Sequence, residues 1–132
     1  MSRIAALAAT LLVSVPSLAA AQSPASLEER TGCAVFLLTA NEMAARFPEM
    51  FKGDDAEMAQ SMFRLMSAAG APLLDAAFAE GAAQGKSAAE MYRAGLGYNL
   101  DAFKGVGPKD PRFKSRGMAL TKRCMAVAAP KD

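Results

Sequence analysis

The sequence predicts an all-α protein, a small bundle of about five short helices whose first and last members are tied by one disulfide, preceded by a cleaved signal peptide. Three observations predict it. Alanine is abundant, glycine and proline recur at intervals, and alternating apolar and polar runs are missing, a pattern that favours short helices over a sheet. The chain opens with an apolar export segment, and two cysteines lie near opposite ends of the remaining chain.

Residues 1–21 have the three parts of a secretory signal peptide. Arg3 supplies a positive start, an apolar stretch runs from Ile4 to Val15, and Pro16 and small residues precede the expected cleavage before Gln22. The apolar stretch falls short of the ~20 residues that span a bilayer. The alanine-rich signal with a short charged start is typical of bacteria, so we expect export to the periplasm or secretion.

Residues 22–132 have a length that suits one helical domain with one modest core. Charged residues recur throughout this part, so we expect no transmembrane segment in it. Its basic and acidic residues nearly balance, and no aromatic residues interleave the basic ones. This composition argues against nucleic acid as a partner.

Cys33 and Cys124 are expected to pair, because two thiols in an oxidising compartment normally form a disulfide. The bridge would close a loop of about ninety residues, which the chain-entropy model values at ~4–5 kcal/mol. The alternative is a redox-active pair, but active dithiols usually occur as Cys-x-x-Cys. The long separation therefore favours a structural disulfide.

The chain contains no histidine. This excludes Ser-His-Asp and Cys-His catalysis, haem ligation by imidazole, and the common zinc sites. It also removes the side chain that changes charge between about pH 5 and 8. The sequence indicates no cofactor.

The first helix is expected over residues 26–47. Ser26 and Glu29 form a capping-box pattern at its start, and Pro48 ends it. Residues 49–52 can add one further turn, closed by Gly53. The apolar face of the first helix consists of Cys33, Phe36, Leu37, Ala40, Ala44 and Phe47.

A second helix is expected from a capping signature at residues 54–57 to Gly70, and a third from Pro72 to Gly85. Glycine favours the end of a helix and proline its first turn, which is why the boundary falls between Gly70 and Pro72. The expected buried stripe of the second helix is Met58, Met62, Leu65, Met66 and Ala69. That of the third is Leu73, Leu74, Ala77 and Phe78.

A fourth helix is expected after the capping box of Ser87 and Glu90, and it carries Met91, Tyr92 and Leu96. Residues 104–111 hold two prolines and two glycines and are expected to form a loop. Asp110 and Pro111 then open the last helix. Its predicted core face consists of Phe113, Leu120, Cys124 and Val127.

Basic residues concentrate near the end of the chain. Between residues 104 and 123 Asp110 is the one acidic residue among seven basic ones. Such a strip can bind phosphates, an anionic envelope surface or an acidic protein. The alternative, a solvated face that balances the acidic half of the chain, is the more common meaning of a charge run. The candidate strip consists of Lys109, Arg112, Arg116 and Arg123.

Met58, Met62 and Met66 recur at i, i+4 and i+8 along one helix. Thioether clusters can bind Cu(I), since soft ligands select soft ions, which makes a Cu(I) or small-ligand carrier the alternative function. Methionine also fills irregular core space. Periodicity does not separate the two uses.

Flexible methionine-rich surfaces can also re-pack around varied partners, such as unfolded proteins or amphipathic peptides. The overall organisation resembles that of the small periplasmic acid-stress chaperones, which are helical, exported and singly disulfide-bonded. The local similarity is limited to residues 33–37, CAVFL, and the cysteine spacing here is much longer. The resemblance therefore implies no role for any particular residue.

A carboxylate-based hydrolase is the third interpretation, because glycosidase-type chemistry needs two carboxylates at a set separation. Tyr92 and Tyr98 flank a glycine-rich turn and could line a cleft. No pair of acids stands out, so we expect a non-enzymatic binding or envelope-associated protein, with a chaperone-like role as one form of it. The candidate acids are Glu42, Glu49, Asp75, Glu80 and Glu90.

Overall fold

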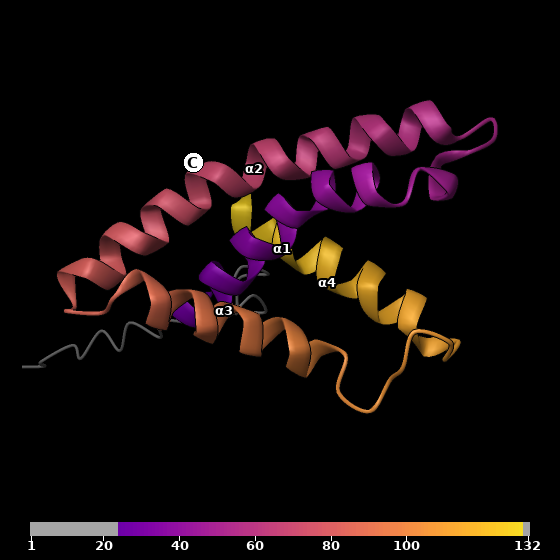
Figure 1. Cartoon of the computed structure of the whole chain (residues 1–132). Helices are drawn as coiled ribbons and strands as arrows, with labels where there is room; N and C mark the ends of the chain where they lie inside the picture. Colours follow the sequence, from indigo (N-terminus) through magenta and orange to yellow (C-terminus); the bar gives the residue numbers. More distant parts are fainter. Residues whose placement is uncertain (1–23, 131–132) are drawn as a thin grey trace, which may run out of the picture.

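The part of the chain that the structure describes, residues 24–130 of a computed structural model, is helical (Figure 1). Over this range it contains four α-helices, one 3-10 turn and no strand, which confirms the all-α prediction. The predicted signal peptide, residues 1–21, lies outside the described residues. The elements are α1 (Leu27–Arg46), η2 (Pro48–Phe51), α2 (Ala56–Ala83), α3 (Ala88–Ala102) and α4 (Arg112–Ala128).

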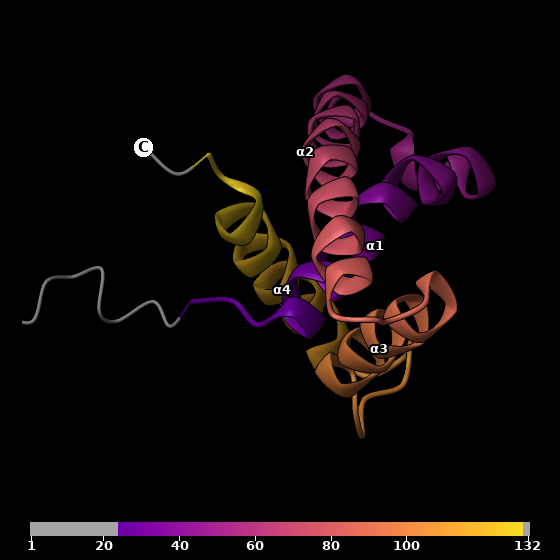
Figure 2. The ribbon, with the colours of Figure 1, turned by 90° about the vertical axis from the view of Figure 1, so that its left-hand side faces the viewer.

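Helix α1 is the central element, and α2, α3 and α4 all pack on it (Figures 1 and 2). It begins where the sequence predicts, since the Ser26 hydroxyl accepts a hydrogen bond from the Glu29 backbone N–H at 3.1 Å. All five residues from Thr31 to Val35 are buried. A helix that is buried all round, rather than along one stripe, must have neighbours on several sides.

The prediction of five helices is wrong, because the second and third expected helices form one continuous α2 of 28 residues. Gly70 does not end this helix. It lies against α1, where a Cβ would lie 3.0 Å from the Leu37 Cβ and 3.1 Å from the Ala34 carbonyl oxygen. Pro72 lies inside α2, although proline removes one backbone hydrogen bond. Packing against α1 outweighs both local signals, since tertiary context overrides helix propensity.

The remaining boundaries agree with the sequence. Helix α2 ends before Gly85, which has a positive φ of 77° and therefore suits glycine. Ser87 and Glu90 make both hydrogen bonds of a capping box at the start of α3. The predicted 104–111 loop joins α3 to α4, and the rings of Phe103 and Phe113 pack across it with centroids 4.8 Å apart.

Cys33 of α1 and Cys124 of α4 form the predicted disulfide, with their Cα atoms 4.9 Å apart. Both residues are fully buried, and they lie at the centre of the core. The buried core cluster consists of Cys33, Leu37, Ala40, Met66, Leu120 and Cys124. Partly buried aromatic and aliphatic residues from all four helices surround it, among them Phe36, Phe63, Leu73 and Tyr98.

The core does not extend along the whole length of α1 and α2. The second half of α1, η2 and the first half of α2 project together as a two-helix arm, from which α4 diverges (Figures 1 and 2). The predicted burial of Met58, Met62 and Leu65 is therefore wrong: their exposed fractions are 68%, 55% and 65%. Met66, nearer the disulfide, is buried as predicted.

Candidate functional site

The arm exposes an apolar surface on both of its helices. We use the name arm surface for five exposed residues: Met43 of α1, Phe47 at the C-cap of α1, and Met58, Met62 and Leu65 of α2. Soluble proteins rarely leave large apolar side chains grouped on one surface unless something binds there. The arm surface is therefore the first candidate site.

Helix periodicity explains how α1 contributes to this surface. Phe36, Ala40, Met43 and Phe47 follow one another at spacings of four, three and four residues, and so share one helix face. Phe36 and Ala40 pack in the core cluster that includes residues of α4. Met43 and Phe47 continue the same face beyond the region that α4 covers.

Helix α2 also has one apolar face that is buried in part and exposed in part, but here the exposed part comes first in the sequence. Met62, Leu65, Ala69 and Leu73 share one face, and Ala69 and Leu73 pack against the core cluster. Met62 and Leu65 lie on the uncovered continuation of that face. The sequence pattern identifies the apolar faces of both helices, but only the position of α4 determines which part of each is buried.

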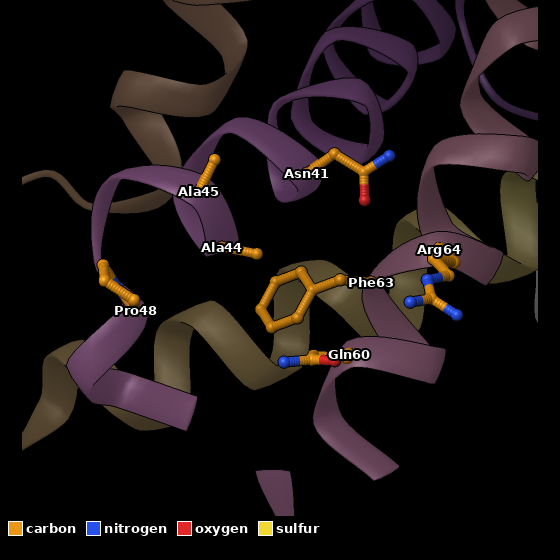
Figure 3. A pocket seen from close by; sticks show the side chains of 7 residues that line it. All are labelled: Asn41, Ala44, Ala45, Pro48, Gln60, Phe63 and Arg64. Carbon is orange, nitrogen blue, oxygen red and sulfur yellow. The ribbon is translucent and has the colours of Figure 1, made fainter. Parts of the chain in front are cut away.

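A pocket of about 270 Å³ lies between the two helices of the arm (Figure 3). Phe63 forms its apolar floor, and Arg64 is the charged side chain beside it. No carboxylate lines this pocket. Its lining residues are Asn41, Ala44, Ala45, Pro48, Gln60, Phe63 and Arg64.

A second pocket, of about 440 Å³, lies where the start of α1 meets the start of α3. It contains Glu28 and Glu90, but Glu90 accepts a hydrogen bond from the Ser87 backbone N–H as part of the cap of α3. A capping carboxylate is already used for structure. Its lining residues are Leu27, Glu28, Thr31, Lys86, Glu90, Met91 and Ala94.

The predicted basic strip does not form one free surface, because its arginines bind within the molecule. Arg112 pairs with Asp110 at 2.8 Å, and Arg116 donates a hydrogen bond to the Ala102 carbonyl oxygen at 3.3 Å. Arg123 binds Glu29 of α1. Lys109 is exposed on the loop before α4.

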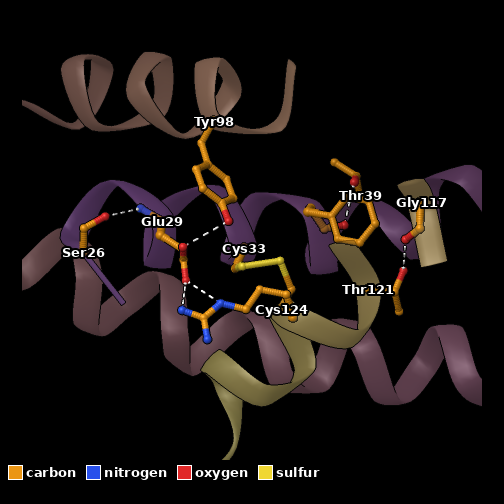
Figure 4. The surroundings of a disulfide bond; sticks show 10 residues. Ser26, Glu29, Cys33, Thr39, Tyr98, Gly117, Thr121 and Cys124 are labelled. Carbon is orange, nitrogen blue, oxygen red and sulfur yellow. Dashed lines mark hydrogen bonds and ion pairs between the residues drawn. A yellow bond between two sulfur atoms is a disulfide. The ribbon is translucent and has the colours of Figure 1, made fainter. Parts of the chain in front are cut away.

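Glu29 is the centre of a polar junction beside the disulfide (Figure 4). Its carboxylate accepts hydrogen bonds from Arg123 Nε at 2.7 Å and from the Tyr98 hydroxyl at 3.1 Å. The junction thus joins α1, α3 and α4. Burial, and then the nearby Glu29 carboxylate, raise the pKa of Tyr98, so its hydroxyl stays protonated and keeps donating. The sequence suggested only a capping role for Glu29.

The candidate catalytic acids are spread over different elements. Glu80 forms a two-point ion pair with Arg30, at 2.6 and 3.0 Å, and this hydrogen bonding lowers the pKa of Glu80. A general acid needs a raised pKa instead. Glu42, Glu49 and Asp75 are exposed side chains on α1, η2 and α2.

The three methionines proposed for Cu(I) do not share a surface. Met58 and Met62 are exposed on the arm, whereas Met66 is 5% exposed in the core. A three-thioether site would require Met66 to leave that core. Across residues 24–130 no group of three or more His, Cys, Asp or Glu side chains is arranged to hold a metal ion.

None of the helices in the described range is both long and apolar enough to cross a membrane. The chain matches no known protein family, no curated protein and no solved structure. The surfaces of the molecule itself are therefore the basis for any functional assignment.

Proposed function

We propose that this is an exported, non-enzymatic binding protein that holds apolar segments of other proteins on its arm surface, in a chaperone-like role. The observation that carries the proposal is the exposure of Met58, Met62 and Leu65 on one face of α2, together with that of Met43 and Phe47 at the C-terminal end of α1 in the same arm. Burying such side chains against a partner is favourable at about 25 cal/mol per Å² of apolar surface.

The chemistry of the arm surface favours varied rather than unique partners. Three of its five residues are methionines, whose unbranched, flexible side chains adapt to differently shaped apolar groups. Promiscuous binders use surfaces of this kind. An extended or helical apolar segment of an unfolded protein is the partner with matching chemistry.

Export is part of the proposal. The three-part pattern of residues 1–21 supports it, and so does the disulfide, because structural disulfides persist mainly in oxidising compartments. Copper transport and carboxylate-based hydrolysis are not proposed, since Met66 lies in the core and Glu80 is held by Arg30.

The experiment follows the aggregation of a reduced, alkylated client protein by light scattering. We expect the protein to slow aggregation, and the double variant Met62→Ser/Leu65→Ser to lose at least tenfold in client affinity while keeping its thermal midpoint. Leu100→Ser is the matched control, because Leu100 is 73% exposed on α3, away from the arm. If the double variant protects the client as well as the unaltered protein does, or if the arm only joins two copies of the chain, the proposal is wrong.

A further inference from the structure

The outer face of α4 is a second exposed surface. Lys114, Met118, Lys122 and Met125 recur at spacings of four, four and three residues, so they share one side of the helix. The opposite side carries Leu120 and Cys124, which are buried in the core. Met118 is 64% exposed, and Figure 2 shows α4 at the edge of the molecule, with one flank turned away from α2 and α3.

The charges of α4 are all positive, since no acidic residue occurs between Arg112 and Ala128. The three arginines, Arg112, Arg116 and Arg123, make contacts within the molecule. Lys114 and Lys122 form no ion pair with any carboxylate of residues 24–130. Lys114 and Lys122 therefore place positive charge on the outer face, on either side of Met118, with no carboxylate partner among the described residues.

We propose that this outer face binds the surface of a membrane that contains anionic lipid headgroups. Long lysine side chains reach headgroup phosphates with their ammonium groups, while their methylene stems lie along apolar surface. Met118 and Met125 lie between and beside these lysines and can enter the boundary between headgroups and acyl chains. The interaction is peripheral, and it is separate from the client binding assigned to the arm surface.

The shape of the face favours a bilayer over a small anion. It is one side of a single helix, and α4 lines neither of the two pockets described above. An anionic bilayer offers a plane of negative charge to which each lysine contributes independently, about fivefold in affinity per residue. An acidic protein partner is the competing source of negative charge, and the experiment distinguishes it.

The test is co-sedimentation of the protein, recovered after export and verified by its mass, with lipid vesicles. The vesicles consist of phosphatidylcholine, with or without phosphatidylglycerol. We expect binding only to the anionic vesicles and a decrease with added salt. Lys114→Gln and Lys122→Gln should each weaken binding about fivefold, and Met118→Ser should weaken it further. Lys52→Gln and Lys86→Gln are matched controls, because both lysines are exposed outside α4.

Equal binding to neutral vesicles, no binding, or unchanged binding of Lys114→Gln and Lys122→Gln would overturn the proposal. If the protein bound soluble polyglutamate more tightly than anionic vesicles, the membrane proposal would be wrong and the partner of this face would be an acidic protein. The α4 variants should still protect the unfolded client. The two proposals can therefore fail separately.

Discussion

Glu29 and Arg123, ninety-four residues apart in sequence, form an ion pair beside the disulfide that joins the same two helices. Arg123 precedes Cys124 directly, and Glu29 lies one helical turn before Cys33. Helices α1 and α4 are therefore joined by a covalent and an ionic contact at one level of the bundle. Beyond this level α4 diverges, and the arm of α1 and α2 is left uncovered (Figure 1).

Removal of the disulfide should destabilise the protein strongly. The bridge spans 91 residues, and the chain-entropy model values a loop of that size at ~4–5 kcal/mol. We expect Cys33→Ser/Cys124→Ser to lower the thermal midpoint by roughly 15 °C or more, measured by circular dichroism. Reductant should have the same effect on the unaltered protein and none on the variant. An unchanged midpoint in the variant would show that the bridge contributes nothing.

The Glu29 junction should contribute less than the disulfide. Glu29→Gln removes the charge that Arg123 and Tyr98 share, and we expect it to lower the free energy of unfolding by about 1 kcal/mol. The neighbouring, exposed Glu28→Gln is the control and should have almost no effect. A double-mutant cycle with Arg123→Gln, measured by urea unfolding, should give a coupling energy of about 0.5–1 kcal/mol. If the losses in unfolding free energy of the two single variants simply added up in the double variant, a direct interaction between Glu29 and Arg123 would be contradicted.

The contact between α1 and α3 depends on a glycine. A Cβ at Gly32 would lie 2.6 Å from Tyr98 Cδ1 and 3.0 Å from the Gly95 carbonyl oxygen. We expect Gly32→Ala to destabilise the protein by about 1–3 kcal/mol, because overpacking displaces Tyr98 or the backbone of α3. Gly97 lies in α3, next to Tyr98, and a Cβ there would have nothing within 4 Å, so Gly97→Ala should instead be neutral or stabilise by up to about 1 kcal/mol. Denaturant unfolding measures the change in unfolding free energy of each variant. Equal changes in the two variants would argue against the close packing of Gly32 on α3.

Acid should weaken the contact between α1 and α2. Arg30 lowers the pKa of Glu80 in the folded state. A group with a lowered folded pKa stabilises the fold above its unfolded pKa of about 4.3, and this contribution disappears as the pH falls through the folded pKa. We therefore expect Glu80→Gln to be less stable than the unaltered protein at neutral pH and to lose less stability on acidification. Urea unfolding between about pH 7 and 3 tests this, with the exposed Asp75→Asn as control.

Local sequence signals predicted much of the fold correctly. The capping residues Ser26 and Ser87 begin α1 and α3, and Gly85 follows the end of α2. Cys33 and Cys124 lie on apolar helix faces, which correctly indicated their pairing. These features depend on residues close in sequence, or on the redox chemistry of two thiols. They can therefore be inferred without knowledge of the packing.

The features that sequence reasoning missed depend on distant neighbours. Gly70 resembles a helix end, but in the fold it allows α1 to approach α2 closely. Arg123 looks like a free surface cation, yet Glu29 binds it from the other end of the chain. Met62 and Leu73 share one apolar face, and only the position of α4 decides that Leu73 is partly covered and Met62 exposed.

The most direct test of the central claim is a nuclear magnetic resonance titration of the protein, labelled with ¹³C at its methionine methyl groups, with the reduced, alkylated client. Methionines occur on the arm surface, in the core and on α4, so each region carries its own probe. We predict that the signals of Met43, Met58 and Met62 shift with increasing client, while those of Met66, Met91 and Met118 do not. Shifts confined to Met118, or no shift at any methionine, would contradict client binding on the arm surface.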